Sequence, residues 1–278
     1  MSKASSMYGL VLAGGASRRM HTDKAALTHN GKSQLQRAFE LLDKVCERTF
    51  VSVRADQTND PTRSSLPQIV DVHTDLGPLA GVSAAQTIHP EVAWLIMACD
   101  LPFISNSTLQ YLIAQRDPAK IATAFRSTHD DLPEPLCAIW EPASAAVVRE
   151  WIAKNNNCPR KLLINSSIKL LEQPDAHALD NINTLAEHLR ALTSLGSHTI
   201  NLNVQYFALF REQAGKRDEQ LDTVASSPAL LYAELQQRYG FKLSMNQLKV
   251  AVNNEFSDWQ TLLKSGDHVA FIPPVAGG

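Results

Sequence analysis

The chain has 278 residues, of which 44% are hydrophobic and 19% charged, as is typical of a globular protein with a buried core. Its formal net charge of −2 argues against nonspecific binding to nucleic acid or to membranes. No apolar run has membrane-spanning length and the N-terminus lacks a signal-peptide core, so we expect a cytoplasmic protein. The four cysteines are scattered, which favours free thiols over disulfides or a zinc site.

The stretch from Leu12 to Lys24 is the most informative in the chain, and it follows an apolar run at residues 8–12 that predicts a buried strand. Its paired glycines let the backbone approach a ligand and turn amides toward it. The cations that follow can offset the charge of a polyphosphate. The alternative is an ordinary turn with solvated arginines. We predict a phosphate-binding loop, distinct from the P-loop, with these residues: Gly14, Gly15, Arg18, Arg19 and Lys24.

Helical spacing over residues 34–46 and a strand at residues 49–53 follow this loop. A short strand at residues 69–70 then runs into Asp71. Strand, helix and strand in this order predict a parallel α/β sheet, whose ligands lie at the carboxyl ends of the strands. A Gly-Pro turn at residues 77–78 opens the next helix and would place backbone amides near a base or a phosphate.

Asp100 follows an unbroken apolar run, Val92 to Ala98, that predicts a buried central strand. A carboxylate in this position lies at the active edge of the sheet. Magnesium prefers such oxygen ligands and usually takes only one or two from the protein. The alternative is that Asp100 caps the turn that follows the strand.

The remaining elements of this region continue the α/β pattern. We predict helices at residues 108–115 and 143–153, strands at 121–125 and 136–140 with a polar loop at 126–135 between them, and a helix that starts after a break at 155–158. Thr184 or Asn183 would cap a last helix over residues 185–192.

These motifs together resemble the molybdenum cofactor guanylyltransferases over roughly residues 8–192. That family usually reads Leu-Ala-Gly-Gly, then Arg-Met-Gly and Asp-Lys, and this chain has His21 where the family has glycine. Further matching segments follow in the order of the family: Gly77-Pro78-Leu79-Ala80-Gly81, Cys99-Asp100-Leu101-Pro102, Pro135-Leu136 through Trp140, and Asn181-Ile182-Asn183-Thr184.

The resemblance implies a Rossmann-like nucleotidyltransferase domain at residues 1–193 that transfers GMP from GTP to molybdenum-molybdopterin and releases pyrophosphate. It implies catalytic roles for Arg19, Lys24 and Asp100, with Asp100 as the Mg²⁺ ligand. Asp71 could accept both N1–H and N2–H of guanine, which adenine cannot offer. Asn181 and Asn183 could contact the pterin or serve in capping. The implied binding residues are Leu12, Ala13, Gly14, Gly15, Lys24, Ser52, Asp71, Gly77, Pro78, Leu79, Asp100, Asn181 and Asn183.

Two alternatives remain for this domain. With His21 in the loop, it could have lost catalysis and serve as a tether for the rest of the chain. It could also be a cytidylyl or sugar-phosphate nucleotidyltransferase of the same fold. The Leu-Ala-Gly-Gly and Gly-Pro-Leu-Ala-Gly segments argue for guanine, because cytidylyl relatives tend to have Ala-Ala-Gly in the loop.

The last third of the chain has a different hydrophobic pattern, which begins after a polar linker at residues 193–199. Residues 200–207 alternate as a half-buried strand does, and an amphipathic helix at 228–239 ends at Gly240. Strands at residues 248–254 and from 268 complete a predicted ubiquitin-like α+β roll (β-grasp) at residues 200–278.

This region resembles the small, sulfur-carrying subunit of molybdopterin synthase, and thiamine-pathway sulfur carriers are the alternative. The matching residues are Tyr206-Phe207-Ala208, Arg211-Glu212, Ala251-Val252-Asn253, Gly266-Asp267 and Phe271 through Gly278.

The Gly277-Gly278 tail has no bulky side chains, so it could thread into the site of a partner enzyme. The resemblance implies that the carboxylate of Gly278 is adenylated and converted to a thiocarboxylate. It also implies several partners: the large subunit of molybdopterin synthase, an adenylating (E1-like) activating enzyme, a sulfur donor, and further a molybdenum insertion enzyme and acceptor molybdoenzymes.

Overall fold

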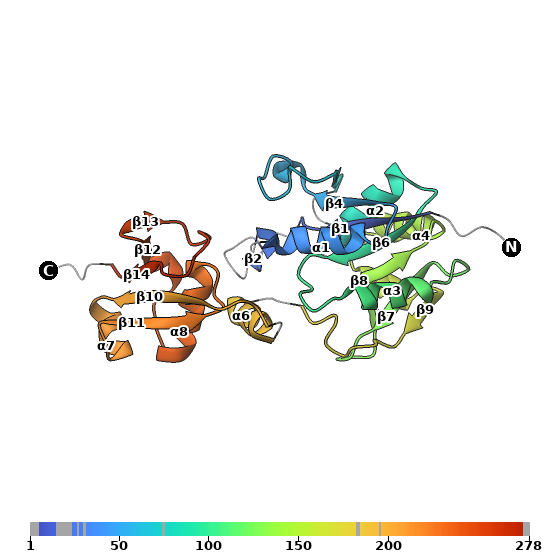
Figure 1. Ribbon diagram of the computed structural model, residues 1–278. Helices are drawn as coiled ribbons and strands as arrows, with labels where there is room; N and C mark the ends of the chain where they lie inside the picture. The colour runs from blue at the N-terminus through green and yellow to red at the C-terminus, as the bar shows by residue number, and fades with distance from the viewer. Residues whose placement is uncertain are drawn as a thin grey trace. The chain divides into compact units, whose positions relative to one another are not determined.

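A computed structural model describes residues 6–14, 24–26, 28–29, 32–73, 76–181, 184–194 and 196–274. These residues divide into two compact units, one within Met1–Ala26 and Ser33–Asn181 and the other within Leu27–Lys32 and Ile182–Gly278 (Figure 1). Among the helices so described, none is long and apolar enough to cross a membrane.

The N-terminal unit is built on a seven-stranded sheet with the strand order β5-β4-β1-β6-β8-β7-β9. The first four of these strands are parallel, β8 is antiparallel to both of its neighbours, and β7 is parallel to β9. The predicted, mostly parallel sheet is therefore confirmed. Its strands are β1 (Met7–Leu12), β4 (Arg48–Val53), β5 (Gln68–Val70), β6 (Ala93–Ala98), β7 (Ala122–Arg126), β8 (Pro133–Trp140) and β9 (Ile168–Leu171).

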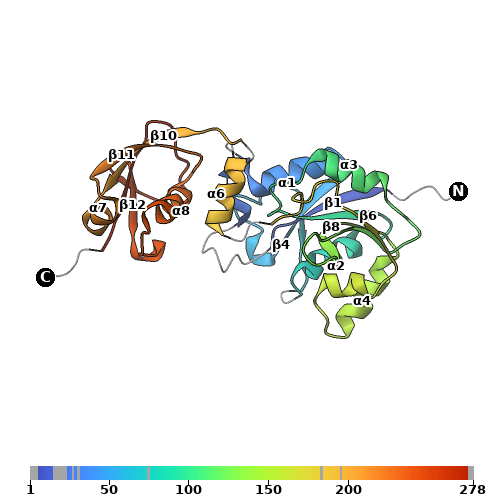
Figure 2. The ribbon, with the colours of Figure 1, turned by 90° about the horizontal axis from the view of Figure 1, so that it is seen from below.

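Helices cover both faces of this sheet (Figure 2). On one face lie α1 (Gln34–Asp43) and α3 (Asn106–Ala114), and their leucines join the core formed by one side of the strands. On the other face lie α2 (Pro78–Ile88), α4 (Ser144–Ala153) and α5 (Pro159–Ile164). Two short helical turns, η1 (Lys24–Ala26) and η2 (Ala55–Gln57), also belong to this unit. Strand β2 (Thr28–His29) pairs with β3 (Lys32–Ser33), and residues Leu27–Lys32 group with the C-terminal unit.

The chain changes direction across the sheet between β1 and β6. From β1 it moves outward through β4 to β5, and α2 then carries it back to β6 on the other side of β1. Leu12 at the end of β1 is paired with Ser52 of β4 and with Ala98 of β6. Such a point, where neighbouring strands feed connections to opposite sides, leaves a crevice at their carboxyl ends where ligands bind in open α/β sheets.

The C-terminal unit has a five-stranded sheet with the order β11-β10-β14-β12-β13, in which β10 and β14 are parallel and the other pairs antiparallel. Tyr232 and Leu235 of the long helix pack with Phe271 of the sheet in one core. This architecture agrees with the predicted β-grasp fold. Its elements are β10 (Ile200–Tyr206), α7 (Ala208–Ala214), β11 (Asp218–Thr223), α8 (Pro228–Tyr239), η3 (Met245–Gln247), β12 (Lys249–Val252), β13 (Glu255–Ser257) and β14 (His268–Ile272).

Strand β8 begins at Pro133, earlier than the predicted start at residue 136. The prolines of this stretch indicate a loop because they donate no hydrogen bond to a sheet. A shift of register between Ala124 and Phe125 on the neighbouring strand β7 accommodates them, as a β-bulge does. The segment 126–135 is therefore only in part a loop.

Helix α6 (Leu185–Ser194) belongs to the C-terminal unit. Thr184 and Glu187 cap it reciprocally, each side chain accepting from the backbone N–H of the other at 3.1 Å. Leu189 and Leu192 are buried in the same core as α8. The structure thus divides after Asn181, whereas the sequence predicted that the first domain extends to residue 193.

We expect Leu192→Ala to destabilise the C-terminal unit by about 2–4 kcal/mol, because Leu192 is 2% exposed and its loss leaves a cavity between α6 and the core. Leu262→Ala, at a leucine that is 49% exposed, is the matched control and should cost little. Denaturant unfolding measures the free energy of unfolding, and hydrogen exchange then shows which elements are destabilised. Faster exchange in α1 or α3 instead of α8 would contradict the placement of α6.

Candidate nucleotide site

Four parallel strands, β5, β4, β1 and β6, end at one edge of the N-terminal sheet. Asp71 follows β5, Gly14 lies after β1 and Asp100 after β6. Gly14 and Asp100 are each two residues beyond the paired Leu12 and Ala98, and the N–H of Cys99 donates to the carbonyl of Leu12 at 3.3 Å. The structure therefore brings the start of the predicted phosphate loop and the predicted metal carboxylate to adjacent strand ends.

Asp71 and Ser52 form the centre of the site. The hydroxyl of Ser52, a buried residue of β4, donates to Asp71 Oδ1 at 2.6 Å. Burial raises the pKa of the Asp71 carboxyl, while the bond from Ser52 and the charge of Arg54 act in the opposite direction. A Cβ at Gly14 would lie 3.2 Å from Asp71 Oδ2, so the backbone of the loop passes directly beside this carboxylate.

The first turn of α2 packs against β4 and β1. Gly77 precedes the helix with φ 53° and ψ −137°, a conformation that glycine adopts without strain, and Pro78 takes the first helical position. A Cβ at Gly81 would lie 2.4 Å from Ser52 Oγ and 2.8 Å from Leu12 Cδ2. The lack of a side chain at Gly81 therefore allows the amino end of α2 to approach the site, where its amides favour an anion or a base edge.

Asp100 is partly buried at the end of β6. No cluster of three or more histidine, cysteine or acidic side chains that could hold a metal occurs among the described residues. One carboxylate at the edge where a triphosphate would lie fits Mg²⁺, which takes most of its ligands from phosphates and water.

The segment before Asn181 is attached to the loop after β7. Asp180 Oδ1 lies 3.3 Å from His129 Nε2 and Asp180 Oδ2 lies 2.8 Å from His177 Nδ1. Because β8 is antiparallel to both β6 and β7, the loop after β7 lies at the same sheet edge as Asp100. Asn181 is exposed there, on the side of the sheet away from β5.

The structure describes most of the predicted binding residues and brings Leu12, Ala13, Gly14, Ser52, Asp71 and the Gly77-Pro78-Leu79 turn to one region. Lys24 begins η1. The predicted site residues that lie outside the described ones are Gly15, Arg18, Arg19, Asn183 and Gly278.

Two arginines of the site are absent from the sequence-based prediction. Arg54 donates to the carbonyl of Gly14 at 2.5 Å, and Arg63 donates to the carbonyl of Ala13. The position of Arg54 directly after a predicted strand could have indicated it, whereas nothing in the sequence indicates Arg63. Arg160, in helix α5, forms ion pairs with Asp130 and Glu134 at 2.7 Å.

Each unit matches a known protein family. Residues 9–170 match the MobA-like NTP transferase domain, and residues 204–278 match the ThiS family. A "Molybdenum cofactor biosynthesis bifunctional protein" of Synechocystis is 35% identical over 178 residues, which are 64% of this chain and 51% of that protein, so the chain spans about half the length of this relative.

Two further similarities concern the N-terminal unit. A "Probable molybdenum cofactor guanylyltransferase" of Synechococcus elongatus is 31% identical over 183 residues, 63% of this chain and 92% of that protein. The solved "Molybdopterin-guanine dinucleotide biosynthesis protein A" from Archaeoglobus fulgidus superposes with a TM-score of 0.59 at 22% identity, covering 68% of this chain and 99% of that one. The structural match supports the fold.

We expect Gly81→Ala to weaken nucleotide binding by at least about tenfold, because the new methyl group would overlap Ser52 Oγ and push α2 away from the site. Ser83→Ala, on the same helix, is the control and should leave binding unchanged. Nucleotide affinity is measured by calorimetric titration on variants shown to be folded by circular dichroism. Unaltered affinity in a folded Gly81→Ala chain would show that the contact between α2 and Ser52 is not part of the site.

Proposed function

Because the chain belongs to the MobA-like NTP transferase family, we propose that its N-terminal unit transfers GMP from GTP to the terminal phosphate of molybdenum-bound molybdopterin. The arrangement of Gly14, Ser52, Asp71 and Gly81 at the switch point of the sheet carries this proposal. It offers a carboxylate, a close backbone and a helix amino end within one crevice. The relatives named as guanylyltransferases support the choice of nucleotide and of acceptor.

Asp71 gives a chemical reason for guanine. An ionised carboxylate accepts two hydrogen bonds from the N1–H and N2–H groups of guanine, and adenine and cytosine present no such pair of donors. Ser52 occupies Asp71 Oδ1 and fixes the orientation of the carboxyl group. Because burial raises the pKa of Asp71, acidification should weaken GTP binding at a higher pH than for an exposed aspartate.

The reaction is a displacement at the α-phosphorus of GTP. An oxygen of the terminal phosphate of molybdopterin forms the new P–O bond, the bond to the bridging oxygen of the β-phosphate breaks, and pyrophosphate leaves with that electron pair. Arg19 and Lys24 would offset charge on the triphosphate, and Asp100 would hold Mg²⁺, which neutralises phosphate charge when bound. Positioning and electrostatics supply the catalysis, so no covalent intermediate with the protein forms.

The C-terminal unit, a member of the ThiS family, would carry sulfur for building molybdopterin. The carboxylate of Gly278 attacks the α-phosphorus of ATP on an adenylating partner, pyrophosphate leaves, and a sulfur donor then displaces AMP to give the thiocarboxylate. Pro273 and Pro274 follow the central strand β14 directly and lack the N–H groups that would extend its pairing. The pairing of β14 therefore ends at Ile272, before the Gly277-Gly278 tail.

Both activities would serve one cytoplasmic pathway. The large subunit of molybdopterin synthase would receive the sulfur, and a molybdenum insertion enzyme and acceptor molybdoenzymes would act before and after guanylyl transfer. We place the residues that carry out guanylyl transfer within residues 1–193 and those that carry sulfur within residues 200–278. Helix α6 folds with the C-terminal unit, because its leucines are buried in that core.

A titration with GTP, CTP and ATP, followed by a transfer assay with molybdenum-molybdopterin, tests the proposal. GTP binding with release of pyrophosphate is the expected result. Preference for CTP would favour a cytidylyl transferase of the same fold. Tight GTP binding without transfer would favour a domain that has lost catalysis and tethers the carrier.

We expect Asp100→Asn to lower guanylyl transfer by at least about a hundredfold with no loss of the fold, because it removes the carboxylate proposed to hold Mg²⁺. Asp43→Asn, at an exposed position on α1, is the control. Initial rates are measured over a range of magnesium concentrations. A normal magnesium-dependent rate in Asp100→Asn would remove this residue from the metal site.

Deletion of Gly278 should abolish sulfur carriage and leave guanylyl transfer intact. One residue of extended chain spans about 3.3–3.6 Å, and a misplacement of about 1 Å can cost on the order of a hundredfold in rate. Mass spectrometry after incubation with ATP, an adenylating enzyme and a sulfur donor detects the exchange of one oxygen for sulfur. The Asp100→Asn chain is the reciprocal control and should still gain the sulfur.

A further inference from the structure

We propose that Arg63 and Arg54 act as positioning residues for the start of the nucleotide loop, by holding the carbonyls of Ala13 and Gly14 so that the amide of Gly14 faces the substrate. This inference rests on the proposed nucleotidyl transfer at the same site. Neither guanidinium contacts the reacting atoms in this scheme. We refer to the two side chains and the carbonyls they hold as the arginine clamp.

Arg63 is the more deeply placed of the two. It is 1% exposed, and its Nε and Nη2 atoms both donate to the carbonyl oxygen of Ala13, at 3.2 and 2.9 Å. Its Nη1 atom donates to Asp60 Oδ1 at 2.9 Å. Arg54 holds the next carbonyl in the chain, that of Gly14, while its Nε and Nη2 atoms pair with Asp56 at 2.9 Å.

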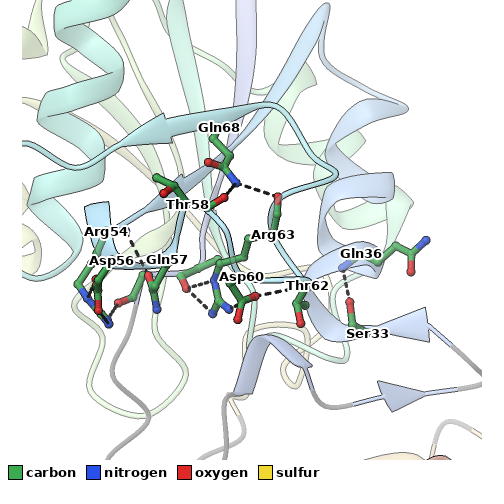
Figure 3. A network of polar contacts seen from close by, with 12 residues as sticks. Ser33, Gln36, Arg54, Asp56, Gln57, Thr58, Asp60, Thr62, Arg63 and Gln68 are labelled. Atoms are coloured by element: carbon green, nitrogen blue, oxygen red, sulfur yellow. Dashed lines mark hydrogen bonds and ion pairs between the residues drawn. The ribbon is translucent and has the colours of Figure 1, made fainter.

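The segment that carries these arginines is itself fastened to the sheet (Figure 3). Gln68 of β5 donates from Nε2 to the carbonyl of Thr58 at 3.1 Å and to that of Arg63 at 3.0 Å. The backbone N–H of Arg54 donates to Gln57 Oε1 at 3.1 Å. The guanidinium groups therefore have a fixed base, which is necessary if they are to orient a loop rather than follow it.

The clamp determines which way the peptide groups at the start of the loop point. The N–H of Ala13 donates to the carbonyl of Ser52 at 3.2 Å, which continues the pairing of β1 with β4. The Ala13–Gly14 peptide bond is trans, so the N–H of Gly14 points away from the carbonyl that Arg63 holds. The amide of Gly14 is thus turned from the arginine side without the help of a bound ligand.

Burial of a guanidinium is expensive, and an apolar side chain of similar size would fill the space at lower cost. The benefit of an arginine here is its pair of N–H donors, because two of them converge on one carbonyl of the loop, that of Ala13. Lysine offers a compact point charge and cannot present this planar pair. The geometry therefore assigns Arg63 to orientation of the loop backbone.

The test compares Arg63→Met and Arg63→Lys with Arg116→Met in the full chain. Arg116 is a matched control, because its side chain is also largely buried, with 11% exposed, and it pairs with Glu141 at 2.7 Å. Glu141 follows the end of β8, at the edge of the sheet opposite to the candidate site. Hydrogen exchange of the peptides covering residues 12–26 is measured without nucleotide. GTP affinity, KM and kcat are measured on the same samples well below their unfolding temperatures.

Both Arg63 variants should exchange faster in residues 12–26 and lose at least about tenfold in kcat/KM for GTP, whereas Arg116→Met should lose stability only. Normal exchange in residues 12–26 of folded Arg63→Met would overturn the inference, and so would full activity of Arg63→Lys, since charge alone would then suffice. Exchange does not depend on catalysis. A wild-type chain without transfer activity would therefore refute the proposed function while leaving the clamp to be judged by exchange.

Discussion

The close contact between α2 and β4 is the constraint on which the rest of the N-terminal site depends. Gly81 lets the helix approach until only a hydrogen atom fits beside Ser52 Oγ. Ser52 in turn donates to Asp71, and Asp71 lies against the backbone of Gly14. Loop, strand and helix therefore meet through small residues, and a larger side chain at either glycine would separate a binding group from its neighbours.

The polar groups around this contact divide into those that we propose to bind the substrate and those that support them. Asp71 and Asp100 lie at strand ends, where a substrate can reach them. Arg63 is buried below the loop and uses its donors on Asp60 and on a carbonyl of the protein. A loop whose direction is fixed beforehand loses less entropy when it binds a triphosphate, and this gives the buried charge a purpose beyond stability.

The fold and the positions of Asp71 and Asp100 were largely predictable from sequence, because strand periodicity and the rule for the carboxyl ends of parallel strands place both residues at one edge. Pattern reasoning missed β11, whose charged sequence at Asp218–Thr223 hides its alternation, and the start of β8, where prolines precede a bulge. It also missed Arg63, because local sequence contains no sign of a contact with Ala13, fifty residues away in the chain.

Helix α6 shows why a family boundary and a folding boundary need not coincide. The carrier match begins at residue 204, yet the core of the C-terminal unit includes Leu189 and Leu192. The capping box of Thr184 and Glu187 starts the helix independently of what precedes it. A connection that contributes its own apolar face to the C-terminal unit is no longer a passive linker, because cutting within it would expose leucines of that core. Part of the segment between the two family matches is thus a structural component of the C-terminal unit.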